Sequence, residues 1–494
     1  AAERIQQIGW ETFTRGEMST VMRWIAALPQ EILSSRPQLR VLYAWALAKS
    51  GRLEEVEACL QGIGPQQLRG EVAAVRAYVA GVHGNLSQAV ELARVALAHL
   101  PEDDLAMRAI VTQNLGVAYH WSGDPIAATQ ALSNAAELTC VAGQKFQTLT
   151  TLAILGRAHE MQGNLHIAAE IYQDAIELAA EAEEQPVPFA GMAHVGMAGV
   201  LYEWNDLARA VAHVLEGVRL SKLGGFVVYQ VFGYAILTKI YEAHGDHEQA
   251  NEVLQRAEWL GQESEYDLVM ALVDEARVQM WMKQNNLKAA NAWAQAHFAD
   301  PNEILDSARE INQITVARIF AGQGKFKEAL SLLDHLLTPA QEARRMENVL
   351  KILTLQAVVY QDQHKLEKAM SALDQALCFA ESEGYSRIFT DYGEPMAQLL
   401  RSALRQGVYP NYAARLLEQS EKSTEASQAL VDPLSARETE VLRLIVAGLS
   451  NQAIADDLTI AESTVKTHIN HIYSKLNVTS RAQAIAKVRE LKFL

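Results

Sequence analysis

The stretch LGVAYHWSGDPIAATQALSNA, from Leu115 to Ala135, decides the fold class of this chain. Apolar and small residues recur at helical spacing on both sides of Gly123. Glycine can adopt the left-handed conformation that ends the first helix, and the Asp124 side chain can cap the start of the second. The small side chain of Ala128 lets the two helices approach closely. The stretch therefore predicts two helices packed across a tight turn.

A short signature like GDPIAA recurs along the chain: Gly, Asn or His first, usually a polar residue second, often Leu third, and Ala or Val sixth. Its ten copies begin at Gly16, Gly51, Gly84, Gly123, Gly163, Asn205, Gly245, Asn285, Gly324 and His364. Intervals of 33 to 42 residues are typical of a solenoid whose helix pairs pack on their neighbours. The pattern resembles a tetratricopeptide repeat stretched from 34 to about 40 residues. No alternating β-branched run predicts a strand, so we expect an all-α fold with a tetratricopeptide-like α-solenoid over residues 1–381.

The concave face of such a solenoid is lined by the first helix of each pair. Positions three and six residues before each turn mix aromatic, basic and acidic side chains, which suits a polar ligand such as a sugar or a peptide. The candidate ligand residues are His120, Arg157, Glu160, Tyr202, Lys239, Glu242 and Arg318. The alternative is a solvated groove whose charges pair with one another. Core packing between helices is the preferred interpretation of a local aromatic cluster, Phe226, Tyr229, Phe232, Tyr234 and Tyr241.

The repeat period fails after Ala369. Gly and Pro interrupt the helical pattern of residues 382–418, which we expect to form helices that cap the open end of the solenoid. Residues 419–433, QSEKSTEASQALVDP, are polar and rich in Ser, so they are predicted to form a flexible linker that ends at Pro433.

Charge is unevenly distributed along the chain, whose formal net charge is −16. From Pro433 onward, 8 Lys and Arg residues oppose 6 Asp and Glu residues, so the rest of the chain carries −18. The phosphates of DNA repel the acidic body of the chain, whereas they do not repel the C-terminal tail, which has more basic than acidic residues. The tail is therefore the part of the chain suited to nucleic acid.

Four short helical patterns follow one another in this tail. Ser450, Ser463 and Ser480 are placed to cap the second, third and fourth helices. The second and third helices, joined by a tight turn, form a helix-turn-helix whose second member enters the major groove. One face of the third helix, opposite its apolar stripe, is predicted to reach base edges through Lys466, Thr467, Asn470 and His471.

Other hydroxyls, helix N-termini and cations in the tail can hold DNA phosphates. These candidates are Ser450, Asn451, Ser463, Thr464, Lys475 and Arg481. His468 and His471 have the spacing of paired metal ligands, but no Cys or carboxylate nearby in the sequence completes a site, so we expect no metal. The alternative that the pattern leaves open is a small protein-interaction domain with a solvated polar face.

The tail resembles a known domain along its length. The stretch LSARETEVLRLIVAGLSNQAIADDLTIAESTVKTHINHIYSKLNVTSRAQAIAKV, residues 434–488, looks like the LuxR-type DNA-binding domain. In that family the third helix is the recognition helix, and positions corresponding to Lys466, Thr467 and Asn470 face the bases. The resemblance implies a small four-helix, LuxR-type helix-turn-helix domain over residues 434–494.

Helical repeats that end in such a domain are similar to the MalT-like regulators, the large ATP-binding regulators of the LuxR family. Residues 15–60 and 383–404 also look like stretches of those proteins. The resemblance implies an ATP-binding module before the repeats, an inducer bound by the repeats, and self-association promoted by ATP. This chain contains no G-x-x-x-x-G-K-[ST] loop and no catalytic set, so we expect it to be no enzyme and to hold no cofactor itself.

The sequence as a whole predicts a cytoplasmic, sequence-specific DNA-binding transcription regulator, with activation favoured over repression. The repeats are expected to sense a small-molecule inducer or a regulatory protein or peptide. Promoter DNA, RNA polymerase and a second copy of the chain on DNA are the further partners, and a membrane is not. The alternative function is a helical-repeat scaffold that binds a regulatory protein, with DNA binding secondary.

Overall fold

The computed structural model is built from α-helices, with one short 3-10 helix, and contains no strand among the residues that it describes. The all-α prediction is therefore confirmed. The structure describes residues 1–14, 17–64, 68–181, 187–262, 267–298, 307–429, 436–446, 449–458, 462–475, 478 and 480–490.

Helix pairs make up most of the chain. The N-terminal elements are α1 (Ala2–Thr14), α2 (Met18–Ala26), α3 (Gln30–Ser34), α4 (Pro37–Lys49), the 3-10 helix η1 (Leu53–Glu55) and α5 (Val56–Leu60). The next pairs are α6 (Arg69–Val82) with α7 (Leu86–His99), α8 (Leu105–Ser122) with α9 (Pro125–Val141), α10 (Lys145–Met161) with α11 (Leu165–Ala180), and α12 (Ala190–Glu203) with α13 (Leu207–Gly224). The last four are α14 (Val227–His244) with α15 (His247–Gln262), α16 (Asp267–Lys283) with α17 (Leu287–His297), α18 (Ser307–Gly322) with α19 (Phe326–Glu342), and α20 (Met346–Asp362) with α21 (Leu366–Glu383).

The turn between the helices of each pair has the predicted conformation. Nine of the ten signature residues have a positive φ, between +55° at Asn285 and +81° at Gly163, and the tenth, Gly16, lies outside the described residues. The following polar residue caps the second helix in four pairs, where its Oδ1 accepts the backbone N–H three residues later at 3.0 to 3.3 Å. These caps are Asp124, Asp206, Asp246 and Asn286.

Small residues let neighbouring helices approach closely. A Cβ on Gly116 would lie 2.6 Å from Cγ of Leu132, and a Cβ on Gly156 would lie 2.5 Å from Cε1 of Tyr172. Gly196, on α12 in the next repeat, meets the same Tyr172 ring, where a Cβ would lie 2.2 Å from Cζ. The buried ring of Tyr172 therefore fills space that only glycine leaves open in both flanking helices.

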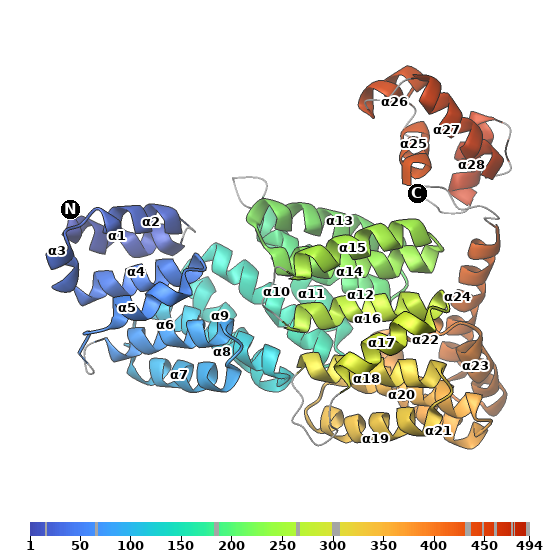
Figure 1. Ribbon diagram of the computed structural model, residues 1–494, viewed down its shortest axis with the longest axis horizontal. Helices are drawn as coiled ribbons and strands as arrows, with labels where there is room; N and C mark the ends of the chain where they lie inside the picture. The colour runs from blue at the N-terminus through green and yellow to red at the C-terminus, as the bar shows by residue number, and fades with distance from the viewer. Residues whose placement is uncertain are drawn as a thin grey trace.

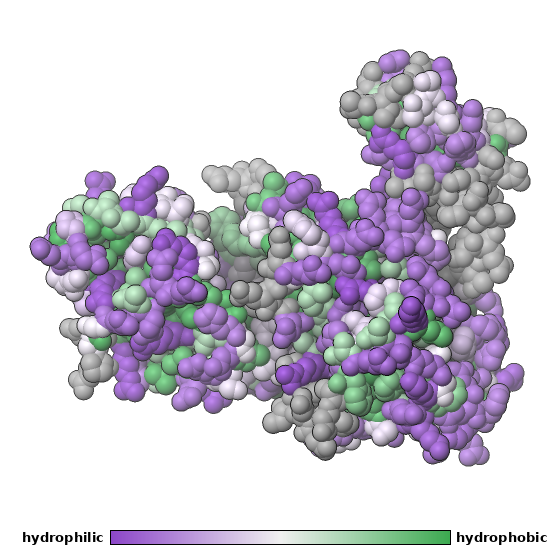
Figure 2. All heavy atoms as spheres, in the orientation of Figure 1, coloured by the Kyte–Doolittle hydropathy of each residue, from purple (hydrophilic) through white to green (hydrophobic). Residues whose placement is uncertain are grey.

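The repeats turn far enough to meet themselves (Figure 1). Arg345, between α19 and α20, donates from Nη1 to the carbonyl of Gly123 at 3.2 Å across 222 residues of sequence. Arg157 on α10 pairs with Glu347 on α20 at 3.1 Å. The inner helices, which are the first helices of the pairs from α8 to α20, therefore enclose a space instead of lining an open groove. On the face seen in Figure 2, hydrophobic atoms also gather in the recess between the N-terminal helices and the later repeats.

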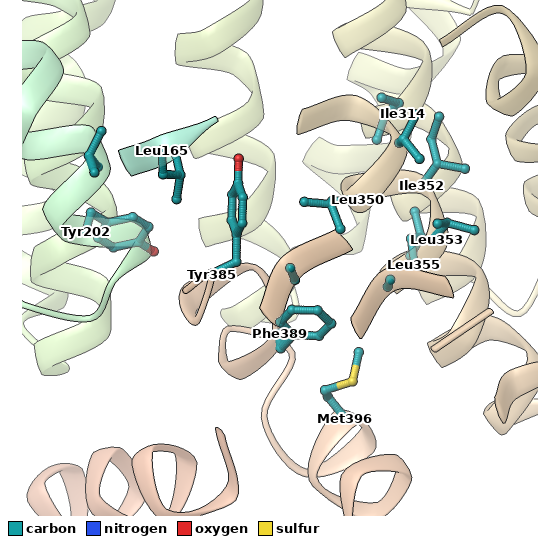
Figure 3. Close-up of a cluster of buried hydrophobic side chains, with 14 of the residues drawn as sticks. Leu165, Tyr202, Ile314, Leu350, Ile352, Leu353, Leu355, Tyr385, Phe389 and Met396 are labelled. Atoms are coloured by element: carbon teal, nitrogen blue, oxygen red, sulfur yellow. The ribbon is translucent and has the colours of Figure 1, made fainter. Parts of the chain in front are cut away.

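The segment after the last repeat does more than cap its end. Helix α23 (Glu394–Gln406) packs on α20 and α21, as a cap would, and is followed by α24 (Pro410–Ala429). Residues 384–392, which contain α22 (Arg387–Thr390) and are called the inner segment below, cross into the superhelix and contact α12 and α20. In Figure 3, Tyr385 and Phe389 leave this segment on different sides, Tyr385 beside Leu165 and Phe389 beside Met396.

Helix α24 differs from the sequence expectation at its C-terminal end. Its last residues, from 419 to 429, fall in the segment predicted to be a flexible linker. Those residues contain no Gly or Pro and include Glu, Lys, Gln and Ala, which continue a helix already started at little cost. Residues 430–433 lie outside the described part of the chain.

The C-terminal domain has its own apolar core. Its helices are α25 (Ala436–Val446), α26 (Asn451–Asp457), α27 (Glu462–Lys475) and α28 (Arg481–Glu490). All four contribute to one cluster of buried residues: Val441, Leu442, Ile445, Ile454, Ala455, Val465, Ile469, Ile472, Ala484 and Val488. Among the helices that the structure describes, none is both long and apolar enough to span a bilayer.

We expect Gly156→Ala to destabilise the repeats. The added methyl group meets the buried Tyr172 ring, so overpacking should lower the free energy of unfolding by about 1–3 kcal/mol, measured by urea denaturation. Gly81→Ala is the matched control, because its Cβ would meet only Ala89 Cβ, at 3.8 Å, inside α6. Helix propensity should make that variant neutral or more stable by up to about 1 kcal/mol. Equal effects of the two substitutions would contradict the packing account.

Candidate functional site

The exposed face of α27 carries the four residues predicted to reach DNA bases. Lys466, Thr467, Asn470 and His471 are exposed, while the stripe of Val465, Ile469 and Ile472 is buried against the other helices. The hydroxyl of Thr467 donates to the carbonyl of Ser463 at 3.1 Å, which orients its methyl group away from that carbonyl. Such a face offers donors for base edges and a methyl group for the thymine methyl.

The residues predicted to hold phosphates are distributed around this face. Ser450 caps α26, because its Oγ accepts the backbone N–H of Ala453 at 3.2 Å, and Asn451 begins that helix. Ser463 and Thr464 are exposed in the first turn of α27, which begins at Glu462, so Ser463 lies inside the helix and not at the cap. The side chain of Lys475 lies outside the described residues.

Two of the predicted DNA contacts also tie the domain together. Arg481 donates from Nη2 to the carbonyls of Ile445, at 3.0 Å, and Leu449, at 2.5 Å, near the end of α25. His471 Nδ1 lies 3.6 Å from a carboxylate oxygen of Glu438, which is buried on α25. Glu438 and His471 are 33 residues apart in the sequence, so the sequence pattern did not predict that this carboxylate lies near the histidine. The contacts give Arg481 and His471 a structural role, which is to hold their helices to α25. Their roles in DNA binding stay predictions.

A second candidate site lies inside the repeats. The inner helices and the inner segment enclose a cavity of about 300 Å³. Five of the predicted groove residues line it: His120, Arg157, Glu160, Tyr202 and Lys239. A sixth, Glu242, lines a small adjoining pocket with Tyr202 and Lys239, whereas the Arg318 guanidinium stacks on the Tyr392 ring at 5.1 Å.

Several lining residues were absent from the sequence prediction. Glu203 is next to Tyr202 on α12, and Glu275 is on α16, whereas the others come from α20 and the inner segment: Glu347, Lys351, Tyr385 and Ile388. Tyr229 and Phe232, interpreted as helix-packing core, also line the cavity. No local pattern brings α20 and the inner segment to α10 and α12, so the sequence held no signal for most of this set.

The charges of the cavity pair with one another, as the alternative to a ligand groove predicted. Arg157 contacts Glu160 at 2.9 Å and Glu347 at 3.1 Å, and Lys351 contacts Glu347 at 3.2 Å and Glu275 at 3.1 Å. Burial alone would raise the pKa of Glu347, but Arg157 and Lys351 lower it to about 2. The carboxylate therefore stays ionised, and little charge is left over for a ligand.

Two polar atoms of the lining have no hydrogen-bond partner among the described residues. They are Nδ1 of His120 and the hydroxyl of Tyr385, and both residues are buried. Burial, with the nearby Arg157 cation, lowers the pKa of His120 to about 3, so the imidazole is neutral. A buried unpaired donor or acceptor costs about 1–3 kcal/mol, which a ligand with hydrogen-bonding groups could recover.

The inner segment is fastened to the end of α12 beside the cavity. The backbone N–H groups of Ser386 and Ile388 donate to the carbonyl and a carboxylate oxygen of Glu203, at 2.7 and 3.1 Å. The hydroxyl of Tyr202 donates to Asp391 at 2.5 Å. Burial and the neighbouring Asp391 raise the pKa of Glu203 from 4.5 to about 7. This carboxyl therefore changes charge near neutral pH at the point of attachment.

We expect Glu203→Gln to remove part of the pH dependence of stability. Glu203 binds a proton in the folded state that the unfolded state releases, so its contribution becomes less favourable as pH rises from about 4.5 to about 7. The cost is at most about 3 kcal/mol, reduced by solvent because Glu203 is only partly buried. The variant should gain stability over the native protein between about pH 5 and pH 8, measured by urea denaturation. An unchanged difference across that window would refute this.

Comparisons with known proteins agree with the two parts of the chain. Residues 70–406 match the family described as the MalT-like TPR region, and residues 432–488 match bacterial regulatory proteins of the luxR family. HTH-type transcriptional regulators MalT of Yersinia pestis (strain Pestoides F) and Yersinia enterocolitica (serotype O:8 / biotype 1B) are each 28% identical over 98% of this chain and 57% of their own length. The chain thus spans a little over half the length of these relatives.

Among solved structures, the Rap protein complexed with competence and sporulation factor is similar over 80% of this chain and 99% of its own, at 12% identity and a TM-score of 0.42.

Proposed function

Because this chain belongs to the family of the MalT-like TPR region and has a luxR-family domain at residues 432–488, we propose that it is a sequence-specific DNA-binding transcription regulator. The observation that carries the proposal is the exposed face of α27, with Lys466, Thr467 and Asn470 opposite the buried stripe. In this proposal the protein is an activator that acts in the cytoplasm on promoter DNA together with RNA polymerase. Its repeats sense an effector.

The DNA-binding domain acts through α27 in the major groove. Its few base-reading side chains each contribute roughly 1–3 kcal/mol of discrimination against the wrong base. Such a small domain gains affinity when two copies bind neighbouring half-sites, because the second contact becomes intramolecular. Self-association of the repeats would therefore strengthen promoter binding without any new base contact.

The cavity inside the repeats suits a small polar molecule without net charge. Its volume of about 300 Å³ is at the lower end of small-molecule sites, and is small for a regulatory peptide. Its acidic and basic groups neutralise one another, so a charged ligand would find no surplus counter-charge. Tyr385 and His120 offer hydrogen bonds that the described residues leave unused.

The inner segment is the proposed route from cavity to DNA. It contributes Tyr385 and Ile388 to the cavity wall and continues directly into α23 and α24, after which the DNA-binding domain follows. A ligand shifts an equilibrium between two conformations only when it binds them with different affinity. Attachment of the inner segment to α12 through Glu203 and Tyr202 offers such a pair of states, attached and released.

We propose no ATP-binding site within these 494 residues. The family resemblance implies a nucleotide-binding module before the repeats, but these 494 residues contain no G-x-x-x-x-G-K-[ST] loop. The proposed mechanism of this chain therefore involves no ATP.

We expect selection of DNA from a random pool to enrich one motif, and the double substitution Lys466→Ala, Asn470→Ala to abolish the enrichment. The variant loses contacts to base edges while its core is unchanged, so its melting temperature should stay the same. Arg443→Ala, which removes an exposed cation from α25, is the control and should select the same motif. Equal enrichment by the native protein and the double variant would contradict the assignment of α27.

We expect Tyr385→Phe to weaken binding of the effector about 3- to 10-fold, because it removes one hydrogen bond from the cavity. A thermal-shift screen of neutral sugars and polyols supplies the ligand, and calorimetry then compares the native protein with the variant. Tyr360→Phe, a substitution outside the lining residues, should bind as the native protein does. A ligand that binds both variants and the native protein equally would not occupy this cavity.

A further inference from the structure

A second cavity, of about 640 Å³, lies between the N-terminal helices and the middle repeats. Its wall is formed by residues of α1, α2, α4, α6 and α7 on one side and of α8, α10, α12 and the turn between α13 and α14 on the other. Neither the sequence prediction nor the proposed function uses it. Its position matches the recess in which Figure 2 shows hydrophobic atoms.

Aromatic rings line both sides of this cavity. On the side of the middle repeats, Phe189 lies between Phe146 and Phe226, with ring centroids 5.5 and 5.0 Å apart. On the N-terminal side, the rings of Phe13 and Tyr78 line the cavity. Flat rings on opposite sides of a cavity of this size suit an aromatic or aliphatic body.

Two hydrogen-bond donors of the wall, on Lys49 and Asn114, are available to a ligand. The ammonium group of Lys49 lies 4.0 Å from the centroid of the Tyr78 ring, and burial lowers its pKa to about 8. The side-chain nitrogen of Asn114 is buried without a hydrogen-bond partner among the described residues. Gln113, by contrast, donates to Thr150 at 2.8 Å.

The charge of this cavity is not compensated. Its described lining residues include Lys49 but no Asp or Glu, and no ion pair to Lys49 occurs within the described chain. This contrasts with the first cavity, where each cation contacts one or more carboxylates. A desolvated ammonium without a counter-ion attracts an anion more strongly than one in water does.

We propose that the second cavity is a binding site for a small carboxylic acid with an apolar or aromatic body. The carboxylate accepts from Lys49 and Asn114, and the body lies among the rings of Phe13, Phe189 and Phe226. The acid is a second effector, distinct from the neutral ligand of the first cavity. Trp121, Ile154 and Met192 line both cavities, so the two ligands share one wall.

The test is calorimetric titration of the full chain with 1-naphthylacetate and with decanoate, which carry the same carboxylate on an aromatic and an aliphatic body. We expect saturable binding of at least one of them with one site per chain. Lys49→Met should weaken that binding at least 10-fold, and Asn114→Leu about 3- to 10-fold, while Lys49→Arg should keep it within about 3-fold.

An uncharged probe shows whether Lys49→Met loses only the contact to the carboxylate or disrupts the cavity as a whole. The alcohol 2-(1-naphthyl)ethanol should bind native protein and Lys49→Met equally, because it uses only the rings. If Lys49→Met does not fold, Asn114→Leu decides the question. Absence of saturable carboxylate binding to the folded native protein, or equal affinity of native protein and Lys49→Met, would overturn the proposal. The proposed function does not depend on this outcome, because DNA selection uses α27 and the neutral effector uses the first cavity.

Discussion

The structure depends on the close approach of helices at small residues. Where Gly156 and Gly196 face Tyr172, the helix axes come near enough for one ring to fill the space between three helices. A single helix pair cannot bury its apolar face alone, so each pair is stable only when its neighbours pack at this spacing. Each repeat is rotated relative to the one before it, and the sum of these rotations brings Arg345 back to Gly123. The cavity is thus a consequence of local packing repeated over many residues.

Closure of the superhelix places ionised groups where water is scarce. Removing such groups from water costs several kcal/mol each, and their mutual attraction offsets this only when every one is paired. The chain of Glu160, Arg157, Glu347, Lys351 and Glu275 meets that condition, with N···O distances between 2.9 and 3.2 Å. Paired charges specify which helices face each other across the cavity, and leave hydrogen-bonding groups such as the Tyr385 hydroxyl as the available contacts.

Local features of this fold could be predicted from the sequence, and contacts across the superhelix could not. The turn residues Gly123 and Asn205, the cap Asp124 and the exposed face of α27 all follow from spacings within one helix pair. Glu347, Lys351 and Tyr385 line the cavity because of rotations accumulated over several repeats, which no short pattern records. The predicted linker fails in part for a different reason, since a polar composition without Gly or Pro is compatible with a helix as well as with a coil.

In the proposed function, the inner segment connects the cavity of the middle repeats to the C-terminal domain. Repeat proteins pass strain mainly to nearest neighbours, so a ligand between two helices changes little beyond them. Residues 384–392 depart from this rule, because they contact α12 and α20 while belonging to neither repeat. They are attached to α12 by two backbone hydrogen bonds to Glu203, whose carboxyl is costly to ionise there, and by the hydrogen bond from Tyr202 to Asp391. Tyr385 and Phe389 are buried in the core, so release of the segment would also expose two aromatic rings, and a ligand would have to offset that cost. In the proposed function, release changes the position from which α23 and α24 start.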